Sequence, residues 1–478
     1  MLRLPESQGA AEPLSPSDIV RLGLCIGCGS CAASEPRATM RWDRHAQLKP
    51  AGPADWYRGR SSAFAKQCPF SPAAENEDAI AAERFPVATT ADPLIGRFDA
   101  AYVGHVEQAP FRDQGSSGGM VSWVAAELLR TGAVDAVAHV SPTGPSETGR
   151  LFDYRISRSP EEVGTGAKSR YYPVDLSSVL AAIRATPGRY AVVGVPCFIK
   201  AIHLLRRLDP VIAERVTHTL GLFCGHMKSA GLVESFAWQL GTELSHVEAL
   251  DYRVKDASRP ANWYRTQLQL DDGSSPAQDW WHLVDGDWGA GFFQNSACNM
   301  CDDVVAETAD IAFGDAWVEP YSSDGRGTNV VIVRSPGLHR MLEGAIAEGR
   351  LALTPVDAEF IIATQDAGLR HRREGLAYRL TWRRRGPVRP RKRVAPNATL
   401  PLRRKLVYRM RAHIAAWSHR ALRAARLAKA PRLYIGWARA ALTVYQGLTY
   451  SRGRIGRLAD RLLPGSPTRT TRSDQGEA

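Results

Sequence analysis

The chain has 478 residues, enough for two or three domains around a large core. Its hydrophobic content of 44% is typical of a globular protein, and no run of 18 or more apolar residues predicts a transmembrane helix. The N-terminus lacks the apolar stretch of a secretory signal. Eight clustered cysteines indicate metal ligands in a reducing compartment rather than a disulfide framework, so we expect a cytoplasmic protein.

The formal net charge of +12 is unevenly distributed. From residue 370 onward the chain has 28 Lys and Arg against 4 Asp and Glu, whereas the preceding residues have 33 against 45. An acidic body therefore precedes a strongly basic tail. Such a tail indicates a binding partner that is independent of any chemistry in the body.

The first chemical motif is CIGCGSC, which contains Cys25, Cys28 and Cys31. Three cysteines at two-residue gaps, with glycines between them, are typical of an iron–sulfur loop, whose fourth ligand comes from further along and precedes a proline. Cys68, followed by Pro69, is the candidate for that ligand. Zinc is the alternative, although zinc sites usually pair two CxxC motifs. So short a segment depends on its metal for folding.

Residues 99–350 predict a sheet covered by helices. Apolar runs at 100–106, 133–140, 190–195 and 216–223 indicate strands, and helical patterns at 118–130 and 199–207 lie between them. Further buried strands are expected near 310–313 and 329–333, with a helix near 337–349. Between these parts, period-two alternation at 252–255, 264–270 and 280–283 predicts antiparallel strands.

Two loops of this body have the composition of ligand-binding loops. QGSSGGMVS (residues 114–122) lies between a strand and a helix, where glycines allow close approach and free N–H groups favour a phosphate. GTGAKSRYY (residues 164–172) could hold a pyrophosphate through Lys168 and Arg170 while Tyr171 covers a ring. The alternatives are an ordinary glycine-rich turn and a solvated loop.

The remaining cysteines follow predicted strands or form a CxxC pair. Cys197 and Cys224 each follow a strand, and if those strands are parallel their ends share the edge where open α/β sheets bind ligands. Cys298 and Cys301 alone could be a redox dithiol or half a zinc site, but a second cluster is the interpretation that uses all four thiols. His226 is either a donor near this group or a satisfied surface histidine. Asp315 either contacts a cofactor or caps a turn.

The tail begins with a run of arginines at 383–393, in which glycine and prolines prevent helix formation and which we expect to be solvated. Residues 402–429 predict a basic amphipathic helix. Its expected apolar face consists of Leu402, Leu406, Met410, Ile414, Trp417, Ala421 and Ala425. A second helix is expected near 433–448.

Taken together, the motifs resemble those of the beta subunit of coenzyme F420 (deazaflavin) reducing hydrogenase and its relatives, which include the 7-hydroxymethyl chlorophyll a reductases. The resemblance covers about residues 20–350 and rests, in order, on CIGCGSC, QGSSGGMVS, GAKSRYYPV, GVPC at Cys197, FCGH at Cys224, CNMC at Cys298 and DIAFGDAW at Asp315. One difference is that many relatives carry a fuller two-motif ferredoxin region, so Cys68 is expected as the fourth ligand here.

The resemblance implies an iron–sulfur flavoprotein oxidoreductase with FAD and 4Fe-4S clusters, two by the cysteine count. Cys25, Cys28, Cys31 and Cys68 would hold one cluster, and Cys197, Cys224, Cys298 and Cys301 the other. The flavin site would include Ser116, Ser117, Gly118, Gly119, Ser122, Lys168, Arg170 and Tyr171. Lys168 and His226 are the candidate catalytic acids, and coenzyme F420 is one candidate substrate.

The expected architecture is mixed α/β. A small ferredoxin-like iron–sulfur segment (1–72) precedes an α/β flavin-binding body (73–369) and a basic linker with an amphipathic helical tail (370–478). The expected partner is ferredoxin or another oxidoreductase subunit. Residues 380–450 are expected to contact an anionic membrane, peripherally at its inner face, or a partner protein. The alternatives are an electron-transfer subunit without its own substrate and a zinc-stabilised protein that binds a membrane or nucleic acid; nucleic acid is the least favoured partner.

Overall fold

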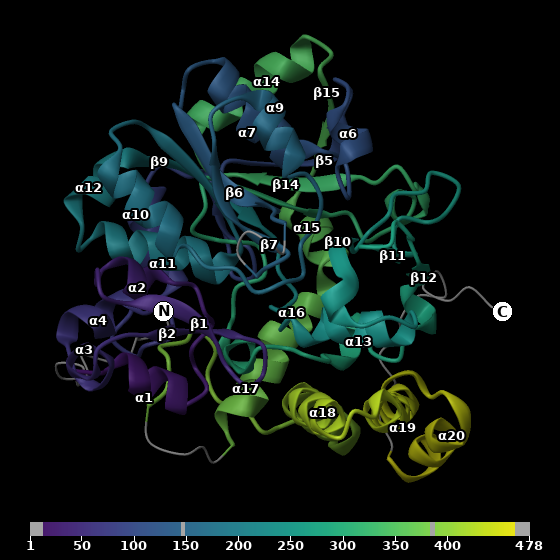
Figure 1. Cartoon of the computed structure of the whole chain (residues 1–478). Helices are drawn as coiled ribbons and strands as arrows, with labels where there is room; N and C mark the ends of the chain where they lie inside the picture. Colours follow the sequence, from purple (N-terminus) through teal and green to yellow (C-terminus); the bar gives the residue numbers. More distant parts are fainter. Residues whose placement is uncertain (1–12, 145–148, 383–387, 464–478) are drawn as a thin grey trace.

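A mixed eight-stranded sheet forms the centre of the molecule (Figure 1). The structure is a computed structural model that describes residues 13–144, 149–382 and 388–463. The strand order is β15-β5-β14-β13-β9-β8-β6-β7. The strand bounds, in that order, are Leu351–Pro355, Ala100–Val106, Asn329–Val333, Ile311–Asp315, Val216–Leu222, Tyr190–Gly194, Ala136–Pro142 and Phe152–Ser157. This sheet confirms the predicted α/β class.

The four middle strands β13, β9, β8 and β6 are parallel, and the flanking strands are antiparallel to their neighbours. Because the carboxyl ends of parallel strands lie at one edge, the segments that follow β8, β9 and β13 are brought together. All five residues of β8 and of β14 are buried. Strands covered on both faces form such continuous apolar runs, which is why their sequences predicted them closely.

Helices and loops cover both faces of this sheet. One face packs against α7 (Met120–Arg130) and α14 (Pro336–Ala347), with Trp123 and Leu342 in the shared core. The other face packs against α10 (Ser177–Ala185) and α11 (Pro196–Arg206), and further along against α15 (Ala358–Thr364) and α16 (Asp366–Arg372). Shorter helices α6 (Phe111–Gln114), α9 (Pro160–Thr165) and α12 (Pro210–Arg215) connect these elements.

The N-terminal segment is a small, loop-rich unit beside α10 and α11 (Figure 1). It contains one short antiparallel hairpin and short helices, and the backbone N–H of Leu176 donates to the carbonyl of Cys28 at 2.9 Å. The element bounds are α1 Pro16–Arg21, α2 Ser30–Ala33, β1 Thr39–Trp42, β2 Leu48–Ala51, α3 Ala54–Arg58 and α4 Ser62–Gln67. Helix α5 (Glu77–Arg84) and a hairpin of β3 (Thr90–Asp92) and β4 (Gly96–Phe98) follow.

A small three-stranded sheet of β10 (Val247–Asp251), β11 (Arg265–Leu270) and β12 (Ala277–Asp279) confirms the expected antiparallel region. Helix α13 (Gly231–Gln239) precedes it. Two of the predicted strands are wrong in detail. Residues 252–255 follow β10, and Trp280–His282 forms a 3-10 turn. Alternating apolar residues are buried there by an aromatic cluster in which Trp280 packs against Tyr171, Tyr252 and Tyr264, so no strand is needed to bury them.

The chain after residue 370 forms helices that pack beside one another and against the body (Figure 1). They are α17 (Glu374–Leu380), α18 (Leu402–Leu427), α19 (Pro431–Tyr450) and α20 (Gly453–Leu462). Both predicted tail helices are confirmed. Within the described residues, no helix is long and apolar enough to cross a membrane.

The expectation of a solvated basic linker is wrong for its described end. Lys392 and Arg393 are buried, and they pair with Asp302 (3.0 Å to Lys392) and Glu307 (2.5 Å to Arg393). These carboxylates follow Cys301 in the chain, so the linker neutralises an acidic group inside the body. Residues 383–387 lie outside the described residues.

The predicted apolar face of α18 is partly wrong. Leu402 and Trp417 are exposed, whereas the buried side includes polar residues such as Arg403, Ser418 and His419. The hydroxyl of Ser418 accepts from the backbone N–H of Phe293 at 2.9 Å, and Arg403 donates to carbonyls of α19. Hydrogen bonding, and not apolarity alone, therefore determines which face of α18 contacts the protein.

Candidate functional site

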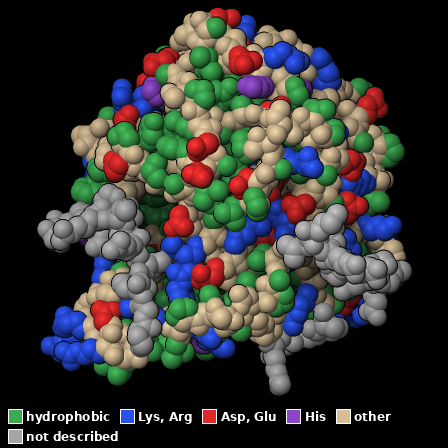
Figure 2. Space-filling model, turned by 180° about the vertical axis from the view of Figure 1, so that it is seen from behind, with side chains coloured by type: hydrophobic (Ala, Val, Ile, Leu, Met, Phe, Trp, Pro, Cys, Tyr) green, Lys and Arg blue, Asp and Glu red, His purple; other side chains and the backbone are tan. Residues whose placement is uncertain are grey.

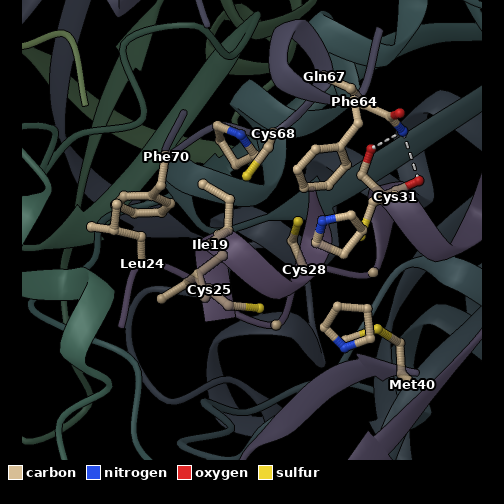
Figure 3. A pocket seen from close by; sticks show the side chains of 17 residues that line it. Ile19, Leu24, Cys25, Cys28, Cys31, Met40, Phe64, Gln67, Cys68 and Phe70 are labelled. Carbon is tan, nitrogen blue, oxygen red and sulfur yellow. Dashed lines mark hydrogen bonds between the residues drawn. The ribbon is translucent and has the colours of Figure 1, made fainter. Parts of the chain in front are cut away.

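Four cysteines of the N-terminal segment line one small apolar cavity (Figure 3). Cys25 and Cys28 lie in the loop before α2, Cys31 lies within α2, and Cys68 follows α4. Ile19, Leu24, Phe64 and Phe70 surround the sulfurs. The structure thus brings Cys68 to the three clustered cysteines, as the sequence predicted.

Glycines allow this loop to lie close to its surroundings. Gly27 and Gly29 have φ of +86° and +78°. A Cβ on Gly27 would lie 2.7 Å from the carbonyl oxygen of Leu48, and one on Gly29 would lie 2.7 Å from a carboxylate oxygen of Asp175. The loop is therefore fixed between the β1–β2 hairpin and the loop before α10, which positions the three thiols.

The environment of these thiols suits a metal cluster. Burial raises the pKa of Cys28 and Cys31 above the usual range and that of Cys68 to about 12. Backbone N–H groups, such as that of Ser30 near Cys28 and that of Phe70 near Cys68, oppose this increase. Donors of this kind are what a cluster's sulfurs accept, and metal binding is what would release the thiol protons.

The other four cysteines come together at the carboxyl edge of the parallel strands. Cys197 lies in the first turn of α11 after β8, and Cys224 follows β9. Cys298 and Cys301 belong to the 3-10 turn Ser296–Met300 and the residue after it. Burial, and then the other three thiols of this group, raises the pKa of Cys197 well above its usual value, so the four groups are electrostatic neighbours.

Arg372 is the main positive charge beside this group. It is buried and donates to the backbone carbonyls of Cys298 and Gly225, and its own pKa is raised, against burial, by all four cysteines. The backbone N–H of Met227 donates to the sulfur of Cys298 at 3.3 Å. Sequence reasoning missed Arg372, because one arginine in a basic run carries no signal of its own.

Among the described residues, no three His, Cys, Asp or Glu side chains lie close enough to share a single metal ion. The zinc alternative requires four ligands around one ion. In an iron–sulfur cluster, by contrast, the cysteines surround a larger group of several irons. The donor sets, all sulfur and four in number at each place, have the composition that such a cluster requires.

A cavity of about 270 Å³ lies at the same sheet edge. Its lining includes nearly all the residues expected at a flavin: Ser116, Ser117, Gly119, Ser122, Lys168, Arg170 and Tyr171, together with His226. Gly118 lies elsewhere, because a Cβ there would meet the backbone of Gly104 and Asn329 at 2.9 Å. It provides close packing of the loop on β5 and β14. Cys224 also lines the cavity.

Contacts between loops hold the cavity's polar side in place. The hydroxyl of Ser116 accepts from the backbone N–H of Ser169 at 2.8 Å, which joins the two loops predicted from the sequence. Lys255 donates to the carbonyls of Ser117 (2.8 Å), Arg326 (2.6 Å) and Arg112. Burial lowers the pKa of Lys255 to about 8. Sequence reasoning missed Lys255, whose only signal was its place in an alternating polar stretch.

The three cations around the cavity differ in how they are paired. Lys168, whose φ is +102°, lies 3.1 Å from a carboxylate oxygen of Asp251. Arg170 lies over the ring of Phe152, 4.9 Å from its centroid. Arg253, which the sequence did not single out, pairs with Asp315 at 3.0 Å. Asp315 thus lines the cavity as half of an ion pair, a role that neither sequence interpretation included.

His226 is buried, so the interpretation as a surface histidine is wrong. Its ring stacks on Trp288 with centroids 4.4 Å apart, and among the described residues its Nε2 has no hydrogen-bond partner. Burial and then the charge of Lys228 hold the pKa of His226 well below its usual value. Tyr171 packs against the same indole at 4.8 Å. An aromatic wall with one neutral, unpaired imidazole fits a flat, polar ring system.

The two cysteine groups and the cavity are close neighbours. Tyr154 lines the cavity and donates to the carbonyl of Val193 at 2.9 Å. Burial, followed by the charges of Cys197, Asp175 and Cys28, raises the pKa of Tyr154, so a member of each cysteine group lies near this one side chain. The sequence gave no indication that residue 154 would lie between the two groups.

The matches to known proteins agree with this arrangement. The chain belongs to the coenzyme F420 hydrogenase/dehydrogenase beta subunit family: the model of the family's N-terminal part matches residues 101–181 and that of its C-terminal part matches residues 188–359. These ranges contain the main sheet except β15, the cavity loops and the second cysteine group, and they exclude the N-terminal cysteine cavity and α18–α20.

The chain is similar to a coenzyme F420-dependent sulfite reductase of Methanocaldococcus jannaschii, with 22% identity over 329 residues. That match covers 66% of this chain and 45% of the relative, so the chain spans less than half of the relative's length. A subunit of the F420-reducing [NiFe] hydrogenase complex from Methanosarcina barkeri matches with 17% identity and a TM-score of 0.45, covering 59% of this chain and 93% of that one.

Proposed function

We propose that this protein is an iron–sulfur flavoprotein oxidoreductase that passes electrons between two 4Fe-4S clusters and a two-electron substrate through FAD. The observation that carries the proposal is the position of Cys224, which belongs to a four-cysteine group and also lines the cavity that contains the flavin-loop residues. A cluster held there would share a wall with the cavity.

The assignment of residues follows from the geometry. Cys25, Cys28, Cys31 and Cys68 would hold one cluster, and Cys197, Cys224, Cys298 and Cys301 the other. When bound, a flavin exchanges electron pairs with organic substrates and single electrons with clusters. Ser116, Ser117, Gly119 and Ser122 would approach it closely, Lys168 and Arg170 would face its phosphates, and Tyr171 would pack on it.

His226 is a better candidate than Lys168 for a group that touches the reacting ring. Its Nε2 is buried, neutral and unpaired among the described residues, whereas Lys168 already pairs with Asp251. The neutral ring can donate or accept one hydrogen bond at the cavity wall. Coenzyme F420 is the substrate that the family suggests, and ferredoxin or a partner subunit would exchange electrons with the clusters. Eight free cysteines support a reducing, cytoplasmic compartment.

The test is anaerobic purification followed by iron, sulfide, zinc and flavin assays on one sample. We expect about eight irons and one FAD per chain, as two cubanes and one flavin require. Cys28→Ser and Cys298→Ser should each reduce the iron content by about half. Met40→Leu, which changes the same N-terminal cavity without removing a thiol, should leave it unchanged. Zinc without flavin would contradict the proposal.

A further inference from the structure

The outward side of the helical tail is basic and apolar at once. Residues 402–462 contain 15 Lys and Arg and a single acid, Asp460, which pairs with Arg403 at 2.6 Å. Six of the eleven exposed large apolar side chains of the described residues lie in the same stretch: Leu402, Trp417, Leu427, Leu433, Leu458 and Leu462. A protein surface rarely gathers exposed leucines unless it binds something.

On α18 these residues form one helical stripe. His413, Trp417 and Arg420 are exposed and lie three or four residues apart, opposite the buried Ile414, Ser418 and Leu422 side. Arg420 lies over the Trp417 ring, 5.2 Å from its centroid. An open hollow of about 440 Å³ runs along this stripe between Trp417 and Trp382, and no carboxylate lines it.

On α20 the pattern is repeated at smaller scale. Leu458 and Leu462 are 56% and 67% exposed and lie one turn apart, and Arg454, Arg457 and Arg461 surround them on the exposed side. Figure 2, in which the molecule is turned so that α20 lies at lower left, shows Lys and Arg gathered at that corner. Exposed leucines among arginines on a short helix are typical of helices that lie in a membrane interface.

We propose that the outward side of α18 and α20 binds the surface of an anionic membrane. The arginines would contact lipid phosphates, Trp417 would lie at headgroup depth, and the α20 leucines would enter the acyl boundary. Nucleic acid accounts for the arginines but gives no reason to expose leucines. The face involved is opposite to the one that the sequence pattern of α18 indicated, since that side is bound to the body. This inference goes beyond the redox function and does not depend on it.

The test is co-sedimentation of the full-length holoprotein with vesicles of phosphatidylcholine alone or with 30 mol% phosphatidylglycerol. We expect binding to the anionic vesicles only. Arg420→Glu/Arg423→Glu should weaken it at least about 30-fold, because each cation near such a surface contributes about tenfold or slightly less and the variant removes two. Leu458→Ser/Leu462→Ser should weaken it at least about tenfold through lost insertion.

The matched control is Arg158→Glu/Arg340→Glu, which makes the same change in net charge at exposed sites beyond β7 and on α14. It should bind within about twofold of the unaltered protein, and all variants should keep their iron and flavin content. The proposal is overturned by absent binding to the anionic vesicles, by equal binding to neutral vesicles, by an equal loss in the control, or by tighter binding to a DNA duplex than to the vesicles.

Discussion

Lys255 shows how a single side chain can organise the cavity from outside the predicted loops. Its ammonium group donates to three backbone carbonyls, two of which belong to the segment that leads into α7. Ser117, one of these acceptors, lines the cavity. The lysine therefore positions the loop without touching the centre of the cavity.

We predict that Lys255→Met weakens FAD binding at least about tenfold, because three charge-assisted hydrogen bonds that hold the loop are lost. The flavin-to-protein ratio after dilution and gel filtration measures this effect, while the iron content should not change. Lys66→Met, at an exposed lysine, is the control. Equal flavin retention in both variants would show that Lys255 does not position the loop.

Gly119 serves the same loop through its backbone. Its φ is +85°, and a Cβ there would lie 2.6 Å from the carbonyl carbon and oxygen of Phe111. We predict that Gly119→Ala destabilises the protein by at least about 2 kcal/mol and releases the flavin, because a left-handed conformation and a backbone clash coincide.

Gly132→Ala provides the comparison for that variant. Gly132 also has a positive φ, +66°, but nothing lies within 4 Å of its Cβ position. It should cost about 1 kcal/mol and leave the flavin bound. Thermal unfolding and the flavin ratio distinguish the two variants. If both variants keep their flavin, close packing at Gly119 is not needed for the site.

At the scale of elements, a buried ionic group joins three distant parts of the chain. Glu77 of α5, Lys200 of α11, Asp302 and Glu307 of the segment before β13, and Lys392 and Arg393 of the linker all belong to it. Burial opposes the ionisation of Asp302, but Lys392 and then Arg393 outweigh it and hold the pKa of that carboxyl below its usual range. The linker is therefore part of the body's interior.

We predict that Lys392→Met lowers the free energy of unfolding by about 3 kcal/mol, because it leaves a buried carboxylate with one partner fewer. Anaerobic urea unfolding, followed by tryptophan fluorescence, measures the change. Lys66→Met should change it by less than about 0.5 kcal/mol. A loss of under 1 kcal/mol for Lys392→Met would mean that Arg393 alone neutralises Asp302.

At the scale of the whole molecule, the N-terminal segment and the sheet body differ in what stabilises them. The segment of residues 13–72 has a small core, and its cysteines line its main cavity. The body has a continuous buried sheet covered on both faces. The division of the chain at 72 and 369 stays a prediction, and tail residues such as Arg372 and Lys392 contact the body closely.

We predict that removing iron with a chelator under mild oxidation unfolds the N-terminal segment first. Trypsin should then cut at Arg58 or Arg60, both exposed, before it cuts the sheet body, because so small a segment depends on its metal. Timed digestion with mass spectrometry would show the order. Untreated holoprotein is the control, and simultaneous loss of the body would contradict this difference in stability.

The sequence by itself determined the strands of the main sheet and the identity of the chemistry-bearing residues. Buried strands such as β5, β8 and β14 form continuous apolar runs, and cysteine spacing is a local property, so both can be recognised without a fold. The sequence also located the cavity loops, because glycines and cations in a strand-to-helix connection have few other uses.

Only the tertiary structure decided how these pieces meet. It brought Cys197, Cys224, Cys298 and Cys301 to one edge through the parallel order of β8 and β9, and it paired Lys392 with Asp302 across 90 residues. It also turned α18 so that Ser418 and His419 face inward. Periodicity records which side chains share a face, but the partner of a charge or hydrogen bond depends on distant chain, and no local pattern encodes that distance.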